Sequence, residues 1–178
     1  SIGRCMAVVI ALLTLAGTAC SGLPGQGTSV DVITPSRADK VVHDYWSVNE
    51  QAFSTYNPDL LLKIQTSPLL EAQVASIKAA KAAGDPMLKS ARPLKKVTTY
   101  VPHQPDYPAQ FLALVETVKV DSAGSPTQDS MAFYYRFAQP SENAPWKANF
   151  YVLATLDSPA RVAIGRDGFA TLLSPGDS

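Results

Sequence analysis

An apolar stripe with helical spacing dominates the first half of the sequence, over residues 36–56. Its positions recur at steps of one, three and four residues: Ala38, Val41, Val42, Tyr45, Asn49, Ala52, Phe53 and Tyr56. That spacing places side chains on one face of an α-helix. The sequence Thr-Pro-Ser at 34–36 provides a capping hydroxyl, and Asn57-Pro58 ends the helix. A stripe this wide predicts a second layer that covers it.

Two shorter helical segments follow the long one. Residues 58–65 predict a short helix that Asn57 caps and that buries Leu61, Leu62 and Ile64. A third helix is expected to start at Pro68, behind a cap provided by Thr66 or Ser67. It ends at Gly84, and its buried stripe is predicted at Leu70, Val74 and Ile77. Residues 85–94 are expected to form a loop.

After the third helix the hydrophobic period changes from that of a helix to that of a strand. Four segments show the strand period: 95–101, 111–120, 130–138 and 146–155. Asp167-Gly168 favours a final hairpin turn between 161–164 and 169–172.

Helices followed by strands with short connections predict an α+β fold. We expect three N-terminal helices, one of them long, packed on a curved, mainly antiparallel sheet of four to six strands, with a cone-like shape. The long helix is expected to cover the sheet face that carries Phe133, Tyr135 and Phe137.

Composition narrows the class of protein. The chain has 178 residues, of which 46% are hydrophobic. This content is enough to fill a core and argues against general disorder. The 15 basic residues balance 15 acidic ones, whereas nucleic-acid binders carry a basic excess, so no nucleic-acid partner is expected. The chain begins without methionine and ends in the turn-like sequence Ser-Pro-Gly-Asp-Ser, which favours a fragment of a longer protein over a simple tail.

The first 20 residues have the order of an export signal. Arg4 precedes an apolar run over 6–16, and small residues lead from that run to Cys20. The run is shorter than the about 20 residues of a membrane-spanning helix. The sequence Leu-Ala-Gly-Thr-Ala-Cys resembles a bacterial lipobox, although Gly17 stands where that pattern has Leu, Val or Ile. We therefore expect lipidation of Cys20, with simple secretion, an uncleaved anchor or a disulfide with Cys5 as alternatives.

Lipidation at Cys20 divides the chain into three parts: a signal peptide over 1–20, a flexible tether over 21–33 and a single α+β domain over 34–173. It places the domain on the extracytoplasmic face of the cell membrane, because two or more acyl chains anchor a protein stably. The mature chain would hold no second cysteine, so neither a disulfide nor thiol chemistry is expected.

Two further stretches carry a resemblance: Tyr-Trp-Ser-Val-Asn-Glu-Gln-Ala-Phe at 45–53 and Leu-Leu-Lys-Ile-Gln-Thr-Ser-Pro-Leu-Leu-Glu at 61–71. Together with the lipobox and the later strands, they resemble an uncharacterised domain family of predicted lipoproteins from high-GC Gram-positive bacteria, over residues 34–173. More loosely, helices leading into a curved sheet are similar to the cone fold of nuclear transport factor 2. That fold serves enzymes, binding proteins and scaffolds, so it implies no single function.

Few residues are candidates for a functional site. His43 and His103 have no cluster of His, Cys or carboxylates around them in sequence, so neither a metal nor another cofactor is expected. Glu116 shares a strand face with apolar neighbours, where burial would raise its pKa and make it a general base. Exposure of that face, or pairing of Glu116 with Lys or Arg, is the alternative.

Polar and aromatic residues complete the candidate pocket lining. Asn49 interrupts the apolar stripe and needs hydrogen-bond partners, from a ligand or from a loop. Tyr45 and Tyr135 are expected beside it. Arg136 would bind an anion or stack on a tyrosine, or else lie on a solvated sheet face.

These features predict a non-catalytic binding or scaffolding domain at the cell envelope, whose partner is a small molecule or an envelope protein. Two alternatives remain open. One is a cone-fold enzyme with Glu116 or Asn49 in a pocket, and the other is a structural module that forms a homodimer through its sheet. A cavity between the long helix and the sheet, lined by polar groups, would favour ligand binding.

Overall fold

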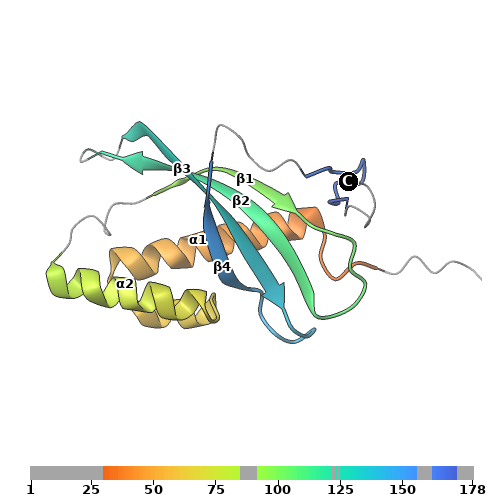
Figure 1. Cartoon of the computed structure of the whole chain (residues 1–178), viewed down its shortest axis with the longest axis horizontal. Coiled ribbons are helices and arrows are strands. Elements are labelled where there is room, and N and C mark those ends of the chain that lie inside the picture. The colour runs from red at the N-terminus through yellow and green to blue at the C-terminus, as the bar shows by residue number, and fades with distance from the viewer. Residues whose placement is uncertain (1–29, 85–91, 122, 124, 156–161, 172–178) are drawn as a thin grey trace, which may run out of the picture.

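The structure, a computed structural model, describes residues 30–84, 92–121, 123, 125–155 and 162–171. Within these ranges three helices come first: α1 (Pro35–Ser54), the 3₁₀ helix η1 (Pro58–Lys63) and α2 (Leu69–Ala83). Four strands follow: β1 (Leu94–Tyr100), β2 (Ala109–Val120), β3 (Pro126–Gln139) and β4 (Lys147–Ala154). Figure 1 shows this order along the chain. The predicted signal peptide and Cys20 lie outside the described residues, as does most of the predicted loop over 85–94.

Helix α1 begins where the sequence predicts. Thr34 lies before it in an extended conformation, and its Oγ1 accepts a hydrogen bond from Arg37 N at 3.3 Å. Its buried residues are five of the eight residues of the predicted stripe, together with Trp46: Ala38, Val42, Tyr45, Trp46, Asn49 and Ala52. The other stripe residues, Val41, Phe53 and Tyr56, are half-buried.

The short helix η1 buries fewer leucines than predicted. Asn57 caps it, because its Oδ1 accepts a hydrogen bond from Asp59 N at 3.2 Å. Leu61 is fully buried and Ile64 half-buried, but Leu62 is 55% exposed. A 3₁₀ helix has three residues per turn, so positions 61 and 64 face the same side and position 62 faces solvent. The predicted burial of Leu62 was therefore wrong.

Helix α2 buries a different face from the one that the sequence predicts. Its buried residues are Leu69, Gln73, Ile77 and Ala80, whereas Leu70 and Val74 are only half-buried. Neither predicted cap acts as one: Pro68 is the N-cap, and the Ser67 hydroxyl donates to the Glu71 carboxylate. The predicted end is confirmed, because Gly84 takes the left-handed conformation, with φ of 65°.

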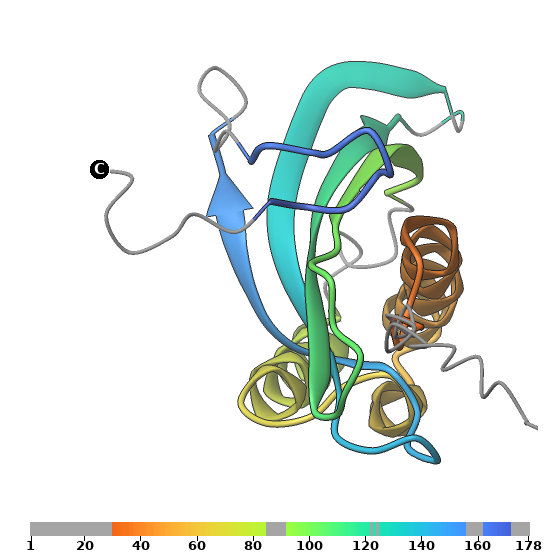
Figure 2. The same cartoon turned by 90° about the vertical axis from the view of Figure 1, so that its right-hand side faces the viewer.

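The four strands form one antiparallel sheet in the order β1-β2-β3-β4, as their short connections predict. The sheet is strongly curved but does not close into a barrel (Figure 2). The fold is therefore α+β, with helices followed by an antiparallel sheet.

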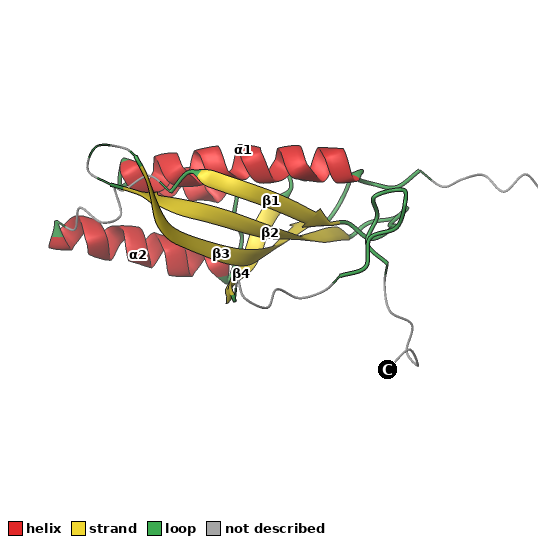
Figure 3. Ribbon diagram, turned by 90° about the horizontal axis from the view of Figure 1, so that it is seen from above, coloured by secondary structure: helices red, strands yellow, loops and turns green. Residues whose placement is uncertain are grey.

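The main core lies between α1 and one face of the sheet, called here the inner face, which carries Phe111, Val115, Tyr135 and Phe137. Figure 3 shows α1 running along this face. The Tyr45 ring meets the Phe137 ring edge-on at a centroid distance of 5.3 Å, and the Tyr135 ring at 5.4 Å. Each such aromatic pair contributes about 0.5–1.5 kcal/mol of stability beyond what the burial of its apolar area contributes. The prediction that the long helix covers this aromatic face is confirmed.

Both ends of the described chain pack onto the sheet. Ile33 is 1% exposed, and Val32 N donates to Gln104 O at 2.8 Å, so the packed part of the domain starts before position 34. Near the other end, Ile164 pairs with Ala170 across a turn in which Gly168 has φ of 85°. The predicted turn is confirmed, although one bridge rather than two strands flanks it in the described residues.

Candidate functional site

The face of the sheet opposite α1, called here the outer face, carries a row of four side chains, one from each strand. Tyr100 pairs with Leu112, Leu112 pairs with Arg136, and Arg136 pairs with Phe150. Because side chains alternate between the two faces of a sheet, these four point away from α1. Leu112 is 43% exposed and Phe150 is 52% exposed, so the row is apolar and open to solvent around one arginine.

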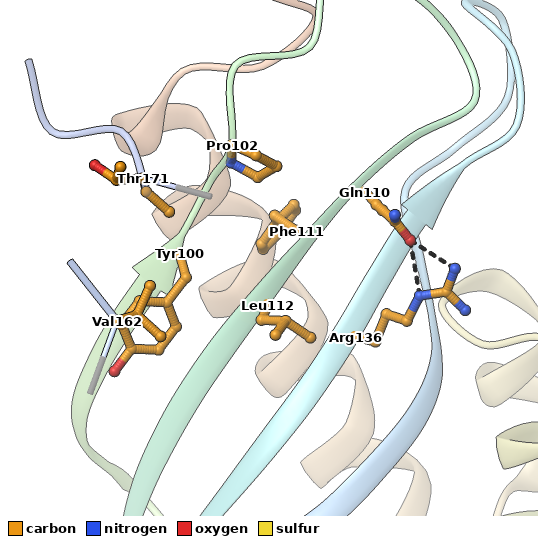
Figure 4. A pocket seen from close by; sticks show the side chains of 9 residues that line it. Tyr100, Pro102, Gln110, Phe111, Leu112, Arg136, Val162 and Thr171 are labelled. Atoms are coloured by element: carbon orange, nitrogen blue, oxygen red, sulfur yellow. Dashed lines mark hydrogen bonds between the residues drawn. The ribbon is translucent and has the colours of Figure 1, made fainter. Parts of the chain in front are cut away.

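Part of this row forms the floor of a cavity of about 400 Å³. The segment 162–171 crosses the end of the sheet beyond β1 (Figure 2). Its Val162, Ala170 and Thr171 line the cavity, whereas its Phe169 packs against the main core. Ala170 N in this segment donates to Val101 O at 2.7 Å, which fixes the segment to the chain just beyond β1. The lining residues come from β1, β2, β3, the loop after β1 and this segment: Tyr100, Pro102, Gln110, Phe111, Leu112, Arg136, Val162, Ala170 and Thr171 (Figure 4).

Arg136 is held at the edge of this cavity by a neutral partner. Its Nε and Nη2 donate to Gln110 Oε1 at 2.9 and 2.6 Å (Figure 4). The backbone of Gln110 is fixed in turn by Gln104, which accepts from Gln110 N at 2.8 Å and donates to Gln110 O at 2.7 Å. Within the described residues, no carboxylate forms an ion pair with Arg136. Its positive charge is thus oriented, and no carboxylate in the described part of the chain neutralises it.

Tyr100 forms one end of the cavity. Burial, and after it the neighbouring Tyr134 and Glu116, raises the pKa of the Tyr100 hydroxyl above its usual range. The hydroxyl therefore stays protonated at neutral pH, and among the described lining residues Arg136 is the one that carries a charge.

None of the four residues predicted to line a pocket is among those that line this cavity. Tyr45 and Tyr135 are buried against each other in the main core, and burial raises the pKa of both. Asn49 is buried on the same side of the sheet. Glu116 lies on the outer face, where its Oε1 is 4.0 Å from Lys96 Nζ, in line with the expected alternative of a basic partner.

Asn49 belongs to a buried polar cluster that the sequence did not indicate. Gln65 Nε2 contacts Tyr45 Oη at 2.9 Å, Gln73 Oε1 at 2.7 Å and Asn49 Oδ1 at 3.3 Å. The cluster joins α1, α2 and the segment between η1 and α2. The hydrogen-bond partners that Asn49 requires are thus side chains of the protein.

A second unpredicted group surrounds His103. Its Nδ1 is 2.7 Å from Asp31 Oδ2, and its Nε2 is 3.1 Å from Asp167 Oδ2. The imidazole stacks on Phe169 at a ring distance of 4.0 Å. Asp31 first, and Asp167 second, raise the pKa of His103 by accepting hydrogen bonds. This Asp31–His103–Asp167 clamp ties the chain before α1 to the segment 162–171.

The described residues offer little for metal chemistry or for spanning a membrane. No three of their His, Cys, Asp and Glu side chains are grouped so that they could hold a metal ion. No helix in the described ranges is both long and apolar enough to cross a membrane.

A family comparison matches most of the chain. The family described as a domain of unknown function, DUF8094, matches residues 29–178. The chain belongs to the DUF8094 family. The match covers α1 and the whole sheet of this DUF8094 domain, together with the segment 162–171. No curated protein matches the chain in sequence.

Among solved structures, the DUF8094 domain is similar to the intermembrane space region of the chloroplast protein ARC6. The TM-score is 0.50 at 13% sequence identity, over 68% of this chain and 96% of that chain. A likeness at this identity shows a shared fold. The likeness to nuclear transport factor 2, the lipoprotein origin and the bacterial range remain predictions.

Proposed function

We propose that this DUF8094 domain is a non-catalytic binding domain that takes a small, largely apolar molecule in its outer-face cavity. The observation that carries the proposal is the cavity itself. Its volume of about 400 Å³ falls within the range of about 300–1,000 Å³ that is usual for small-molecule sites. Its walls are mainly apolar, with a few polar groups at the edge, which is the usual composition of such sites.

The lining of the cavity supports binding rather than catalysis. General acid–base chemistry needs a titratable group within hydrogen-bond reach of the reacting atom. The described lining residues include no Asp, Glu, His or Cys, and the pKa of Tyr100, the one tyrosine among them, is raised by burial, which disfavours its use as a base. The enzyme alternative based on Glu116 or Asn49, and the alternative of a homodimer through the sheet, stay predictions.

The location that we propose for the domain is the extracytoplasmic face of a cell membrane, through lipidated Cys20. The support is the order of Arg4, apolar run, small residues and cysteine in the sequence. Residues 21–29 then connect the anchor to the packed domain. In this arrangement the domain lies in the cell envelope. Its partner there is a small apolar molecule rather than a nucleic acid.

Binding in the cavity is tested with the neutral fluorescent probe N-phenyl-1-naphthylamine, whose emission rises in apolar sites. We expect saturable binding that weakens in Leu112→Gln, because Leu112 forms the cavity floor. Leu153→Gln is the matched control, since Leu153 is 61% exposed on β4 and does not line the cavity. No saturable binding, or equal losses in the two variants, would count against the proposal.

The anchor is tested separately by metabolic labelling with a fatty-acid analogue. Cys20→Ala should abolish labelling, whereas Cys5→Ala should leave it intact because the signal peptide is removed with Cys5. Unchanged labelling of the Cys20→Ala chain would overturn the proposed anchor.

A further inference from the structure

We infer that the molecule bound in the outer-face cavity is an amphiphilic monoanion, an apolar chain that ends in a carboxylate held by Arg136. This inference rests on the proposed function and specifies its ligand. The feature that points to it is an unneutralised arginine set into an apolar row of the sheet.

The hydrogen-bonding state of Arg136 suits a carboxylate. A guanidinium has five N–H donors in a planar fork, and the only described side-chain partner is Gln110 Oε1, which accepts from Nε and Nη2. Further donors therefore remain for a ligand. The neutral Gln110 orients the fork without cancelling its charge, and an oriented guanidinium binds a carboxylate through two parallel hydrogen bonds.

The surroundings of Arg136 suit an apolar chain. Leu112 and Phe150 flank it on the neighbouring strands, and both are partly exposed. From Arg136 on β3 to Tyr100 on β1 the row crosses two strand spacings, or about 9–10 Å. A chain lying along Leu112 towards Tyr100 would be covered by Val162 and Ala170 of the segment 162–171.

The charge of the site matches a monoanion. Arg136 is the one basic side chain among the described lining residues, and no helix ends there. A phosphate or another multiply charged group usually engages several cations or backbone N–H groups. A single carboxylate neutralises the charge of one arginine, and the low polarity of the apolar surroundings strengthens the ion pair.

Dodecanoate and dodecan-1-ol test this inference, because they share a chain length and differ in the charge of the head group. Each is titrated into the 178-residue chain at about pH 8, where the carboxylate is ionised, and displacement of N-phenyl-1-naphthylamine is followed. We expect dodecanoate to bind tighter by about tenfold or more, as for a hydrogen bond to a charged group. Arg136→Gln should remove that preference, because it weakens dodecanoate binding far more than dodecanol binding.

Two further variants make the result decisive. Arg37→Gln is the matched control, because Arg37 is an exposed arginine on α1 outside the cavity, and it should keep the preference. Arg136→Lys keeps the positive charge without the guanidinium fork, so it should keep part of the preference for dodecanoate. It also tests the role of the charge if Arg136→Gln does not fold.

The possible failures separate the two proposals. Equal binding of dodecanoate and dodecanol to the unaltered chain, or a preference that survives Arg136→Gln, would overturn the inferred anion while leaving cavity binding in place. Absence of binding by the probe and by both amphiphiles would overturn the proposed function itself.

Discussion

Gln65 shows how one buried side chain connects three segments of the fold. It is 1% exposed, and its Nε2 faces acceptors on Tyr45, Asn49 and Gln73. An amide nitrogen carries only two hydrogens, so the longest of these contacts, to Asn49, is the weakest. The backbone beside Gln65 also joins the sheet, since Thr66 N donates to Ala148 O at 3.0 Å. Gln65 thus adds hydrogen bonds to the packing of η1 and α2, which also rests on the apolar cluster around Leu61 and Ile77.

Replacement of Gln65 by Leu should destabilise the domain, because it leaves the Tyr45, Asn49 and Gln73 acceptors buried without a donor. We expect the free energy of unfolding, measured with urea, to fall by about 1–3 kcal/mol. The control Gln51→Leu, at an exposed position of α1, should change it by less than about 0.5 kcal/mol. Equal effects at the two positions would show that the polar cluster contributes nothing.

Sequence patterns indicate part of this cluster and miss the rest. The burial of Asn49 follows from its place in the apolar stripe of α1. Gln65 and Gln73 are hidden from such an argument because glutamine is mostly exposed in proteins. Their burial comes from partners 16 and 8 residues away, which a periodic pattern does not reveal.

At the scale of elements, the Asp31–His103–Asp167 clamp connects the cavity to the rest of the domain. Asp167 belongs to the segment 162–171, which lies over the cavity, and His103 belongs to the loop that follows β1. A neutral imidazole donates from one nitrogen only, whereas both His103 nitrogens face carboxylates. The clamp is therefore complete only when His103 is protonated.

Stability should depend on pH through this clamp. The pKa of His103 is raised in the folded state. Its stabilising contribution is therefore fully present below the unfolded value of about 6.5 and is lost as pH rises through the higher folded value. The melting temperature of the unaltered protein should exceed that of His103→Gln most near about pH 6, and the gap should close above the folded pKa.

The control for this experiment is His43→Gln. His43 is an exposed histidine on α1 whose Nδ1 lies 2.9 Å from Asp39 O and 3.4 Å from Asp39 Oδ2. The variant loses this exposed contact between residues one turn apart, which contributes little to stability, and keeps the clamp. As pH rises, the melting temperature of His43→Gln should fall in parallel with that of the unaltered protein. A gap between the unaltered protein and His103→Gln that stays constant, or widens, towards alkaline pH would contradict the role of the clamp.

The clamp itself was not predictable from sequence. Asp31 and Asp167 are separated from His103 by 72 and 64 residues, and the three lie in loop-like stretches without a repeating pattern. The local sequence pattern predicts only the turn that carries Asp167, because Asp167-Gly168 favours a hairpin turn.

For the whole molecule, hydrophobic periodicity predicted the α+β class, the long helix and the four described strands. It also predicted that α1 covers the face with Phe133, Tyr135 and Phe137. It did not predict the cavity on the outer face. In the structure Tyr45, Trp46, Phe111 and Phe137 pack closely between α1 and the sheet, and the cavity lies on the outer face. Its position depends on where the segment 162–171 packs, which is a tertiary contact without a local signature.

The most direct test of the account is to locate a bound apolar molecule on the domain. Methyl NMR spectra of the isotope-labelled chain, recorded during titration with N-phenyl-1-naphthylamine, report which side chains meet the probe. We predict that the largest shifts fall on Leu112, Val162 and Ala170, while Val42 and Leu69 between α1 and the sheet stay unchanged. Shifts centred on Val42 and Leu69, or spread evenly over exposed methyl groups, would contradict binding in the outer-face cavity.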